Sequence, residues 1–338
     1  MKEYYDYSLL AHNTFGIDAR CRRFVEFSSV EEACEVAAML AKEATPYIII
    51  GGGSNLLLTR DYEGSVVRSA IQGISVLADD GDCLLVRVGS GVCWDEWVAT
   101  CVERGWHGAE NLSLIPGDVG ASAVQNIGAY GVEACDLIDC VEAVRIADGQ
   151  QVTIAAADCQ YGYRQSRFKQ EWKDQYLITG VVYRLSHRFE PRLDYGNIRS
   201  ELQRLGIETP TAQQLRQVII DIRQAKLPDP KVEGNAGSFF MNPVVTREKF
   251  LSLQQQYPDM PHYFIDEQHE KVPAGWMIDQ CGWKGRSLGR AGVHAKQALV
   301  LVNRGGATGA EVVALCEAVR HDVKEKFDID IHPEVNII

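Results

Sequence analysis

The chain has 338 residues, of which 46% are hydrophobic and 24% are charged. This length is too great for one small core, so we expect two or three subdomains, which the hydrophobic content is sufficient to fill. The 34 basic and 46 acidic residues give a formal net charge of −12, which repels nucleic acid and anionic membrane surfaces. The composition therefore favours a globular protein that binds neither nucleic acid nor membrane.

The start of the chain is polar and tyrosine-rich, and no later window approaches the roughly 20 apolar residues that a membrane span needs. We therefore expect a cytoplasmic protein. Its 10 cysteines are scattered and form no Cys-x-x-Cys pair, which favours reduced cysteines over disulfides or zinc ligands. No metal site is predicted.

The first predicted elements are a strand, a helix and a second strand. Residues 23–27 alternate as a short strand, and Ser28 or Ser29 caps a helix that extends to Leu40. The apolar, β-branched residues that begin at Tyr47 then predict a buried strand. This strand ends abruptly in a glycine-rich turn at residues 51–55.

Three glycines, a serine and an asparagine form this turn, in the order Gly51-Gly-Gly-Ser-Asn55. Glycines let backbone amides approach an anion, and the two polar side chains add hydrogen bonds to phosphate oxygens. A Rossmann fingerprint is excluded, because Leu56 stands where its third glycine should be and no helix pattern follows. The turn would then join two strands, and a glycine turn with only a geometric role is an equally good interpretation of this motif alone.

Further strands are predicted over 65–68 and 84–89, followed by a helix over 93–104 that stops at Gly105. A second glycine-rich segment, residues 114–131, consists almost entirely of small residues and turn formers. It permits close approach to an extended ligand, although residues 121–123 could simply pack a helix against a sheet. Two such segments separated by a strand and a helix suggest one ligand that spans both.

The remaining elements follow from local signals. Asp148-Gly149 predicts a hairpin between strands 141–146 and 151–154, and residues 177–185 form the next strand. Thr211 and Gln214 form a capping box for a helix that ends before Pro228. The predicted elements beyond it are helix 246–255, loop 257–273, helix 274–281, strand 298–303, helix 308–327 and strand 329–338.

Six motifs occur in order between about Thr14 and the C-terminus, and their combination is far more specific than any one of them. They are Gly51-Gly-Gly-Ser-Asn55, Ile115-Pro-Gly117, Gln125-Asn-Ile-Gly-Ala-Tyr-Gly131, Gly162-Tyr-Arg164, Gly234-Asn-Ala-Gly-Ser-Phe-Phe240 and Pro333-Glu-Val335. Together they resemble the motifs of the UDP-N-acetylenolpyruvoylglucosamine reductases, in the subclass with an extra tyrosine-bearing loop.

The resemblance implies an α+β fold, namely the FAD-binding fold of the vanillyl-alcohol-oxidase class followed by a substrate domain. We expect FAD-binding subdomains over 1–70 and 71–225 and a substrate domain over 226–338, whose last strand returns Glu334 to the active site. It also implies an NADPH-dependent monomeric flavoenzyme that reduces UDP-N-acetylglucosamine-enolpyruvate to UDP-N-acetylmuramate. That step belongs to peptidoglycan precursor synthesis, and so to cell wall biogenesis, cell shape and cell division.

The same resemblance assigns roles to individual residues. Hydride transfer from reduced FAD leaves negative charge on the substrate, so the site needs a fixed cation and a proton donor. Arg164 matches the cation, Ser238 the proton donor, and Glu334 a partner that helps to polarise the substrate carboxylate. The implied ligands of non-covalent FAD are Gly51, Gly52, Gly53, Ser54, Asn55, Ile115, Gly117, Gly120, Gln125, Gly128 and Arg223. Those of the substrate are Tyr163, Tyr195, Lys226, Asn242, Tyr263 and Gln297.

Two alternatives remain at this point. The first is a flavin-dependent oxidase of the same fold, in which His107 or Cys101 could hold FAD covalently, although no motif supports such a linkage. The second is a catalytically inert nucleotide sensor, in which Ser238, Arg164 and Glu334 would have structural roles only. The completeness of the motifs argues against the sensor.

Overall fold

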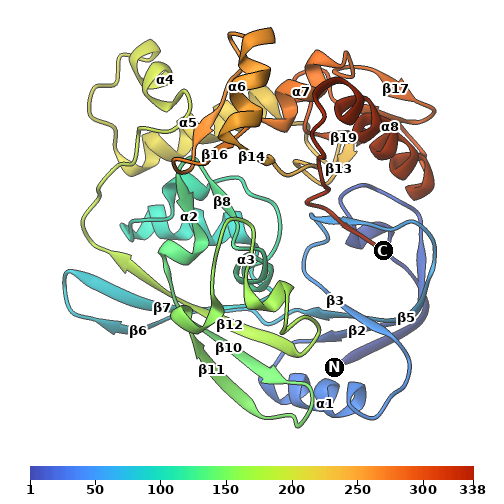
Figure 1. Ribbon diagram of the computed structural model, residues 1–338. Coiled ribbons are helices and arrows are strands. Elements are labelled where there is room, and N and C mark those ends of the chain that lie inside the picture. Colours follow the sequence, from blue (N-terminus) through green and yellow to red (C-terminus); the bar gives the residue numbers. More distant parts are fainter. The chain divides into compact units, whose positions relative to one another are not determined.

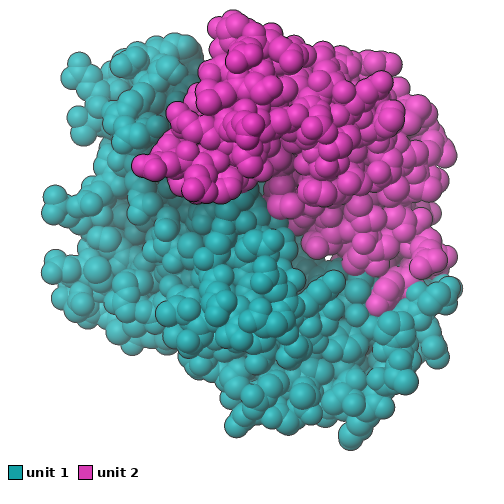
Figure 2. All heavy atoms as spheres, viewed as in Figure 1, with its two compact units in different colours: residues 1–7, 21–52, 63–225 teal, residues 8–20, 53–62, 226–338 magenta.

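The computed structural model describes residues 1–338, which form two compact units shown in different colours in Figure 2. Unit 1 comprises residues 1–7, 21–52 and 63–225, and unit 2 comprises residues 8–20, 53–62 and 226–338. Each unit is therefore assembled from three segments of the chain. None of the helices combines the length and the apolar content that crossing a membrane would require.

Unit 1 contains two large sheets and the two-stranded sheet of β8 and β9 (Figure 1). The four-stranded sheet has the order β1-β2-β5-β3, with β3 parallel to β5, and the five-stranded antiparallel sheet has the order β11-β10-β12-β7-β6. The strands are β1 (Lys2–Ser8), β2 (Arg20–Phe27), β3 (Tyr47–Ile50), β5 (Tyr62–Ser69), β6 (Ile74–Asp79), β7 (Cys83–Gly89), β8 (Gly128–Ala129), β9 (Val132–Glu133), β10 (Ile138–Arg145), β11 (Gln151–Ala155) and β12 (Tyr176–Ser186), and the helices are α1 (Val30–Leu40), α2 (Trp94–Arg104), α3 (Val119–Gln125), α4 (Ile198–Arg204) and α5 (Ala212–Lys226).

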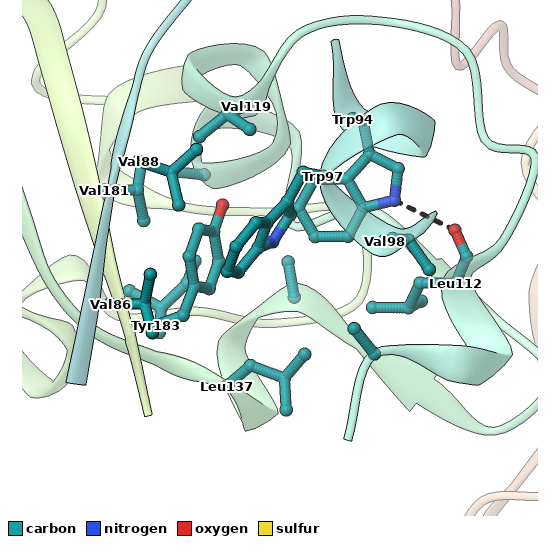
Figure 3. Packing of buried hydrophobic residues seen from close by; sticks show 14 of the residues in the cluster. Val86, Val88, Trp94, Trp97, Val98, Leu112, Val119, Leu137, Val181 and Tyr183 are labelled. Carbon is teal, nitrogen blue, oxygen red and sulfur yellow. Dashed lines mark hydrogen bonds between the residues drawn. The ribbon is translucent and has the colours of Figure 1, made fainter. Parts of the chain in front are cut away.

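The main core of unit 1 lies between the five-stranded sheet and the pair α2 and α3 (Figure 3). The ring of Trp97 stacks on Tyr183 at a centroid distance of 5.5 Å, and the indole N–H of Trp94 donates to the carbonyl of Leu112 at 2.9 Å. The Tyr183 hydroxyl lies 3.1 Å from that of Ser122 on α3. The polar groups of Trp94 and Tyr183 are therefore paired, whereas the indole nitrogen of Trp97 is buried without a hydrogen-bond partner.

The predicted helix termini of unit 1 are confirmed. The hydroxyl of Ser29 accepts a hydrogen bond from the amide of Glu32 at the start of α1, and α2 ends at Gly105, whose φ of 68° is left-handed. Thr211 and Gln214 make the reciprocal bonds of a capping box before α5. The buried face of α5 packs with α4 in a cluster that includes Leu215, Ile219 and Ile198.

Unit 2 is organised around a four-stranded sheet with the order β13-β19-β18-β17, which α8 covers (Figure 1). A smaller sheet, β14-β16-β15, packs with α6, and β20 pairs in parallel with β4. The elements are β4 (Leu56–Leu57), β13 (Gly234–Asn235), β14 (Val244–Thr246), α6 (Arg247–Gln256), β15 (Tyr263–Phe264), β16 (His269–Lys271), α7 (Ala274–Gln280), β17 (Ser287–Leu288), β18 (Ala291–Val293), β19 (Leu301–Asn303), α8 (Gly309–Phe327) and β20 (Asn336–Ile337).

The structure supports one open alternative, that small residues of the second glycine-rich segment pack a helix against a sheet, and it corrects two sequence-based expectations. The second glycine-rich segment contains the helix α3, whose small residues pack closely against β7 and β12. The expected loop over 257–273 includes the short strands β15 and β16. The strand expected over 329–338 is wrong for most of its length, because only the last residues pair, with β4, and Glu334 precedes that strand.

Candidate cofactor and substrate site

The first glycine-rich turn follows β3, and its first two glycines lie against the second glycine-rich segment. A Cβ atom at Gly51 would come 2.9 Å from the Cβ of Ala121. One at Gly52 would come 3.3 Å from the Cα of Gly117. The amides of Gly51 and Gly52 make no hydrogen bond within the chain. Because Gly51 and Gly52 have no side chains, the space beside their unpartnered amides stays open. Such amides are suited to bind phosphate oxygens, so this part of the turn fits a nucleotide pyrophosphate.

The rest of the turn belongs to unit 2 and organises the C-terminal segment. Gly53 has φ +67°, and a Cβ there would lie 1.9 Å from the carbonyl oxygen of His12, so only glycine fits. The carbonyl of Asn55 accepts hydrogen bonds from both the backbone and the side-chain amide of Asn336, each at 3.1 Å. Its own side-chain amide donates to the carbonyl of Glu334 at 3.4 Å. Ser54 lies at the bend of the same turn.

The second glycine-rich segment is held by hydrogen bonds at the start of α3. The amides of Val119 and Gly120 donate to the carbonyls of Val92 and Ser90 at 2.9 and 2.8 Å. A Cβ at Gly120 would come 2.8 Å from that of Ser90, so this glycine permits close packing. Gly117 has φ +119°. Ile115 packs against the main core of unit 1, and Gln125 is the last residue of α3.

Asp118 is a buried residue with a carboxyl group. It lies in the site that we call the cradle, which consists of the glycines Gly51 and Gly52 together with residues 117–121. Its Oδ1 lies 3.3 Å from the Cβ position of Gly52. Its Oδ2 lies 3.7 Å from a guanidinium nitrogen of Arg68, beyond hydrogen-bonding distance, and has no hydrogen-bond partner. Burial raises the pKa of the Asp118 carboxyl from 3.8 to about 6, although Arg68 opposes the shift. No pattern in the sequence pointed to this carboxyl group, which stands within a run of small residues.

Arg164 lies at the tip of a tight turn in unit 1. Gly162 and Gln165 exchange two backbone hydrogen bonds of 3.0 Å, and Arg164 between them has φ +55°. Its guanidinium donates to the carbonyls of Asn126, at 3.2 Å, and Gly128. A Cβ at Gly128 would come 2.9 Å from that guanidinium, so glycine leaves room for the arginine. The structure therefore brings the predicted residues Arg164 and Gly128 together.

The buried side chain of Asn126 connects this turn to its surroundings. Its amide nitrogen donates to the carbonyl of Gly162 and to Glu133, both at 2.9 Å, and its oxygen accepts from the amide of Cys135 at 3.0 Å. Every hydrogen-bonding group of the side chain is therefore used. Asn126 is a positioning residue for the Arg164 turn, and the sequence showed it only as part of a motif.

The predicted substrate tyrosines of unit 1 are exposed side chains. Tyr163 lies beside the Arg164 guanidinium, with the Cζ of Arg164 5.4 Å from its ring centroid. The ring of Tyr195 packs over Gly131, where a Cβ would come 3.4 Å from the Cβ of Tyr195. Asn111 supports this arrangement, because its buried amide donates to the carbonyls of Tyr130 and Arg192, each at 2.9 Å.

Arg223 is a half-buried cation on α5, and its Nε atom is shielded from solvent. Burial lowers the pKa of its guanidinium, while a hydrogen bond with Tyr130 favours the charged form. Its Nε has no hydrogen-bond partner. A cation whose donor is buried without a partner is unfavourable unless an anion compensates it, so Arg223 is suited to the acidic part of a ligand.

Ser238 follows a turn that the buried residue Asn235 shapes. The side-chain oxygen of Asn235 accepts from the amide of Gly237 at 2.9 Å, and Gly237 has φ +70°. On the other side, the amide of Phe239 donates to the carbonyl of Leu299 at 2.7 Å. The half-buried Ser238 hydroxyl makes no hydrogen bond with its own loop, so the interpretation as a turn-stabilising serine finds no support.

Glu334 lies beside the Ser238 segment within unit 2. Its amide donates to the carbonyl of Phe239 at 2.8 Å, and Pro333 forms a bridge with Phe240. The structure therefore places two of the three predicted catalytic residues on adjacent stretches of backbone, although they are almost a hundred positions apart in sequence. The third, Arg164, lies in unit 1.

The remaining predicted substrate residues of unit 2 fall into two groups. Asn242 and Gln297 lie near the start of α7, because the Asn242 side chain accepts from the amide of Ala274 at 2.9 Å and the Gln297 oxygen is 3.3 Å from the Cβ position of Gly275. Tyr263 is about half exposed on β15, and Lys226 ends α5. Through this hydrogen bond Asn242 helps to hold the start of α7, in addition to its predicted role as a substrate ligand.

Family comparison defines the class to which this fold and cradle belong. A family model described as an FAD binding domain matches residues 21–155, which include the first glycine-rich turn and α3. The structure of UDP-N-acetylenolpyruvylglucosamine reductase from Thermus caldophilus has the same fold, with a TM-score of 0.64 at 22% identity over 99% of this chain and 98% of that one. The protein thus contains an FAD-binding domain, and the predicted fold class and FAD cofactor are confirmed.

A second family model, the C-terminal domain of UDP-N-acetylenolpyruvoylglucosamine reductase, matches residues 229–338. The reductase from Bacteroides fragilis is 57% identical over 98% of this chain and 99% of the relative. That from Chromobacterium violaceum is 47% identical over 98% of both chains. The chain belongs to the UDP-N-acetylenolpyruvoylglucosamine reductase family, which confirms the resemblance of its motifs.

Proposed function

We propose that the protein reduces the enolpyruvyl ether of UDP-N-acetylglucosamine-enolpyruvate to the lactyl ether of UDP-N-acetylmuramate, with NADPH as the reductant. The observation that carries this proposal is the 57% identity to a reductase across 98% of the chain. The ordered turns around Arg164 and Ser238 support it, because each presents a side chain of the type that this reaction needs. The protein would act as a cytoplasmic monomer in peptidoglycan precursor synthesis.

FAD, when bound, would supply the redox chemistry by taking a hydride from NADPH and passing it to the terminal vinyl carbon of the substrate. The chain would hold the cofactor through its two glycine-rich segments and Arg223, without a covalent bond. Cys101 is unsuited to flavin attachment, because it is fully buried in the core and burial raises the pKa of its thiol. His107 is engaged with Glu110, 2.8 Å from its Nδ1.

Ser238 is the proposed proton donor to the substrate carbon next to the carboxylate. Serine is a weak acid at neutral pH, so it can fill this role only toward a strongly basic carbon and from a fixed position. Its neighbours provide that position: Asn235 holds the turn before it, and the rings of Phe239 and Phe240 are buried after it. An unpartnered hydroxyl leaves its proton available for transfer.

Arg164 and Glu334 are the proposed groups that act on the substrate carboxylate. Negative charge grows there when hydride arrives, and a fixed guanidinium stabilises it without having to reorganise. Arg164 is fixed by the carbonyls of Asn126 and Gly128. Glu334 would assist the polarisation, from a backbone that is tied to Phe239 and Asn55.

The nucleotide and sugar parts of the substrate would be held mainly by side chains of unit 2. We propose that Tyr263 belongs to an extra tyrosine-bearing loop, and that the chain divides into subdomains 1–70, 71–225 and 226–338. These contacts would contribute binding energy and little stabilisation of charge in the transition state. The proposed substrate residues are Tyr163, Tyr195, Lys226, Asn242, Tyr263 and Gln297.

Purified protein tests the proposal directly. We expect a yellow protein that releases FAD on denaturation and oxidises NADPH without oxygen only when UDP-N-acetylglucosamine-enolpyruvate is added. Oxygen consumption with an alcohol or hydroxy acid, and no response to the enolpyruvyl compound, would instead establish the oxidase. A colourless protein that binds nucleotide without turnover would establish the inert sensor.

A further inference from the structure

The carboxyl group of Asp118 faces the space beside the unpartnered amides of the glycine turn. Its Oδ1 is 3.3 Å from the Cβ position of Gly52, and its Oδ2 is 3.7 Å from that of Gly51. Side-chain exposure is only 11%, and Oδ2 has no hydrogen-bond partner. A buried carboxyl oxygen without a hydrogen-bond partner therefore lies beside the proposed position of the pyrophosphate.

Asp118 has no structural task that would explain this position. It stands at the N-cap of α3 but makes no capping hydrogen bond. The first two helical amides, those of Val119 and Gly120, already donate to Val92 and Ser90. Arg68, near the end of β5, is the charged group that faces the carboxyl; it forms a long ion pair of 3.7 Å with Oδ2 and donates a hydrogen bond to Glu26 of β2 at 3.1 Å.

We propose that Asp118 is a proton-carrying ligand of the FAD pyrophosphate: its neutral carboxyl group donates a hydrogen bond to a phosphate oxygen, so that binding of FAD is accompanied by uptake of a proton from solvent. This inference rests on the proposed position of the pyrophosphate at the Gly51–Asn55 turn. An ionised carboxylate beside the turn would repel the phosphates, whereas a carboxylic acid supplies a donor to them.

The environment of Asp118 already favours its protonated form. With a pKa of about 6, roughly one Asp118 in ten is protonated at pH 7, against fewer than one in a thousand at the ordinary value of 3.8. A bound pyrophosphate adds negative charge and raises the pKa further. Since the complex holds the proton more tightly than the free protein does, affinity for FAD decreases as pH rises above about 6, by up to about tenfold per unit.

The test is titration of the full-length apoprotein with FAD between pH 5.5 and 8.5, followed by flavin fluorescence. The wild type should show this rise in Kd, and calorimetry in buffers of different ionisation enthalpy should show proton uptake near pH 7.5. Asp118→Asn, which keeps a donor but cannot titrate, should bind FAD with a nearly constant Kd and more tightly than the wild type at pH 8. Asp118→Ser offers a second donor that does not titrate, should Asp118→Asn fold poorly.

Asp148→Asn is the matched control, because it removes an exposed carboxyl group of the β10–β11 hairpin, where Asp148 pairs with Arg145, and leaves Asp118 and Arg68 unchanged. It should retain the wild-type pH dependence. Equal pH profiles for the wild type and both Asp118 variants, or no proton uptake by the wild type, would overturn the proposal. A folded Gly52→Val variant with wild-type affinity for FAD would instead show that the pyrophosphate lies elsewhere, and so would reject the proposed cofactor position.

Discussion

Three buried asparagine side chains hold the loops that carry the proposed site residues. Asn126 fixes the Arg164 turn, Asn235 shapes the turn before Ser238, and Asn111 joins the backbone near Tyr195 to the β8–β9 hairpin. A side-chain amide suits this work, because it offers donors and an acceptor without a charge that burial would penalise. Loops without regular structure thereby gain defined positions.

Replacement of Asn126 by aspartate should disrupt the Arg164 turn. The variant loses the donors to Gly162 and Glu133 and places a second carboxylate about 3 Å from Glu133. We expect a loss of about 2–4 kcal/mol of unfolding free energy, measured in urea, together with a lower kcat. In the double variant with Glu133→Gln, the second carboxylate is removed. We expect this variant to recover part of the lost unfolding free energy and part of the lost kcat. An Asn126→Asp protein as stable and active as the wild type would show that these bonds do not position Arg164.

The sequence identified Arg164, Ser238 and Glu334 only through their motifs, and it could not show what supports them. The bond from Asn126 to Gly162 joins residues that are 36 positions apart, and that from Asn55 to Glu334 joins residues 279 apart. Such pairs follow from the tertiary fold, so no local pattern reveals them. Asp118 was missed for the same reason, because its significance lies in what surrounds it.

Elements with strong local signals were predicted accurately. Ser29 caps α1, Gly105 ends α2, and Thr308 with Glu311 forms the capping box of α8. Each of these ends is decided by side chains within one helical turn. The helix α3 and the last strand depend on distant partners instead: α3 on close packing against β12, and β20 on pairing with β4. The local sequences of these two segments show little preference for a helix, a strand or a loop.

The β8–β9 hairpin allows a test of how Tyr195 is placed. Gly131 has φ +77° and supports the Tyr195 ring, whereas Gly149 in the β10–β11 hairpin has φ +69° and nothing within 4 Å of its Cβ position. Gly131→Ala and Gly149→Ala should therefore both cost about 1 kcal/mol of stability through backbone strain. Only Gly131→Ala should raise the KM for the UDP-sugar substrate, by about threefold to tenfold. Equal KM values in the two variants would show that Tyr195 does not contribute to substrate binding.

The glycine turn after β3 allows a second test. Gly52 has no left-handed φ, so a side chain adds bulk without backbone strain. Gly52→Val would place its branched carbon 3.3 Å from Asp118 Oδ1 and fill the space beside the free amides. We expect a folded protein that binds FAD at least about tenfold more weakly, seen as a low ratio of flavin to protein absorbance, with Gly52→Ala intermediate. Full flavin content in folded Gly52→Val would remove the phosphate role of the turn.

At the scale of the whole molecule, the two units are interleaved in sequence. Unit 2 takes residues 8–20 and 53–62 as well as 226–338, and these early segments bury Phe15, Leu57 and Leu58 completely. Thr14 bonds to the carbonyl of Asn235 at 2.6 Å, and β4 pairs with β20. The longest segment of unit 2 begins at residue 226, where the sequence changes character, and it packs with two segments from the first part of the chain.

An isolated fragment of residues 226–338 should consequently fail to fold. It would expose the surfaces that Phe15 and Leu57 cover, and each large side chain contributes about 1.5–3 kcal/mol when buried. We expect a circular dichroism spectrum with little helix and no cooperative thermal transition, while the full-length chain shows both. Cooperative unfolding of the fragment would show that residues 8–20 and 53–62 are dispensable for the unit.

The proposed reaction has two halves, which substitutions at the proposed catalytic residues should separate. Reduction of FAD by NADPH needs no proton donor at the substrate carbon, whereas reduction of the enolpyruvyl ether does. Ser238→Ala should therefore bleach the flavin at the wild-type rate when NADPH is mixed rapidly without oxygen. Reoxidation by the enolpyruvyl substrate should be slower by about 10²–10⁴-fold or more, as for loss of a well-placed general acid. Arg164→Ala should also slow this half and weaken substrate binding, because the carboxylate is present in the ground state.

Ser287→Ala, on the exposed strand β17, is the matched control and should leave both rates unchanged. The comparison is sharp because the hydroxyl of Ser238 makes no hydrogen bond within its loop, so its removal should not disturb the fold. An unchanged melting temperature would confirm this. If the flavin of Ser238→Ala is reoxidised by substrate as fast as that of the wild type, the proton comes from another group. The ordered turn at Ser238 then has only a structural role.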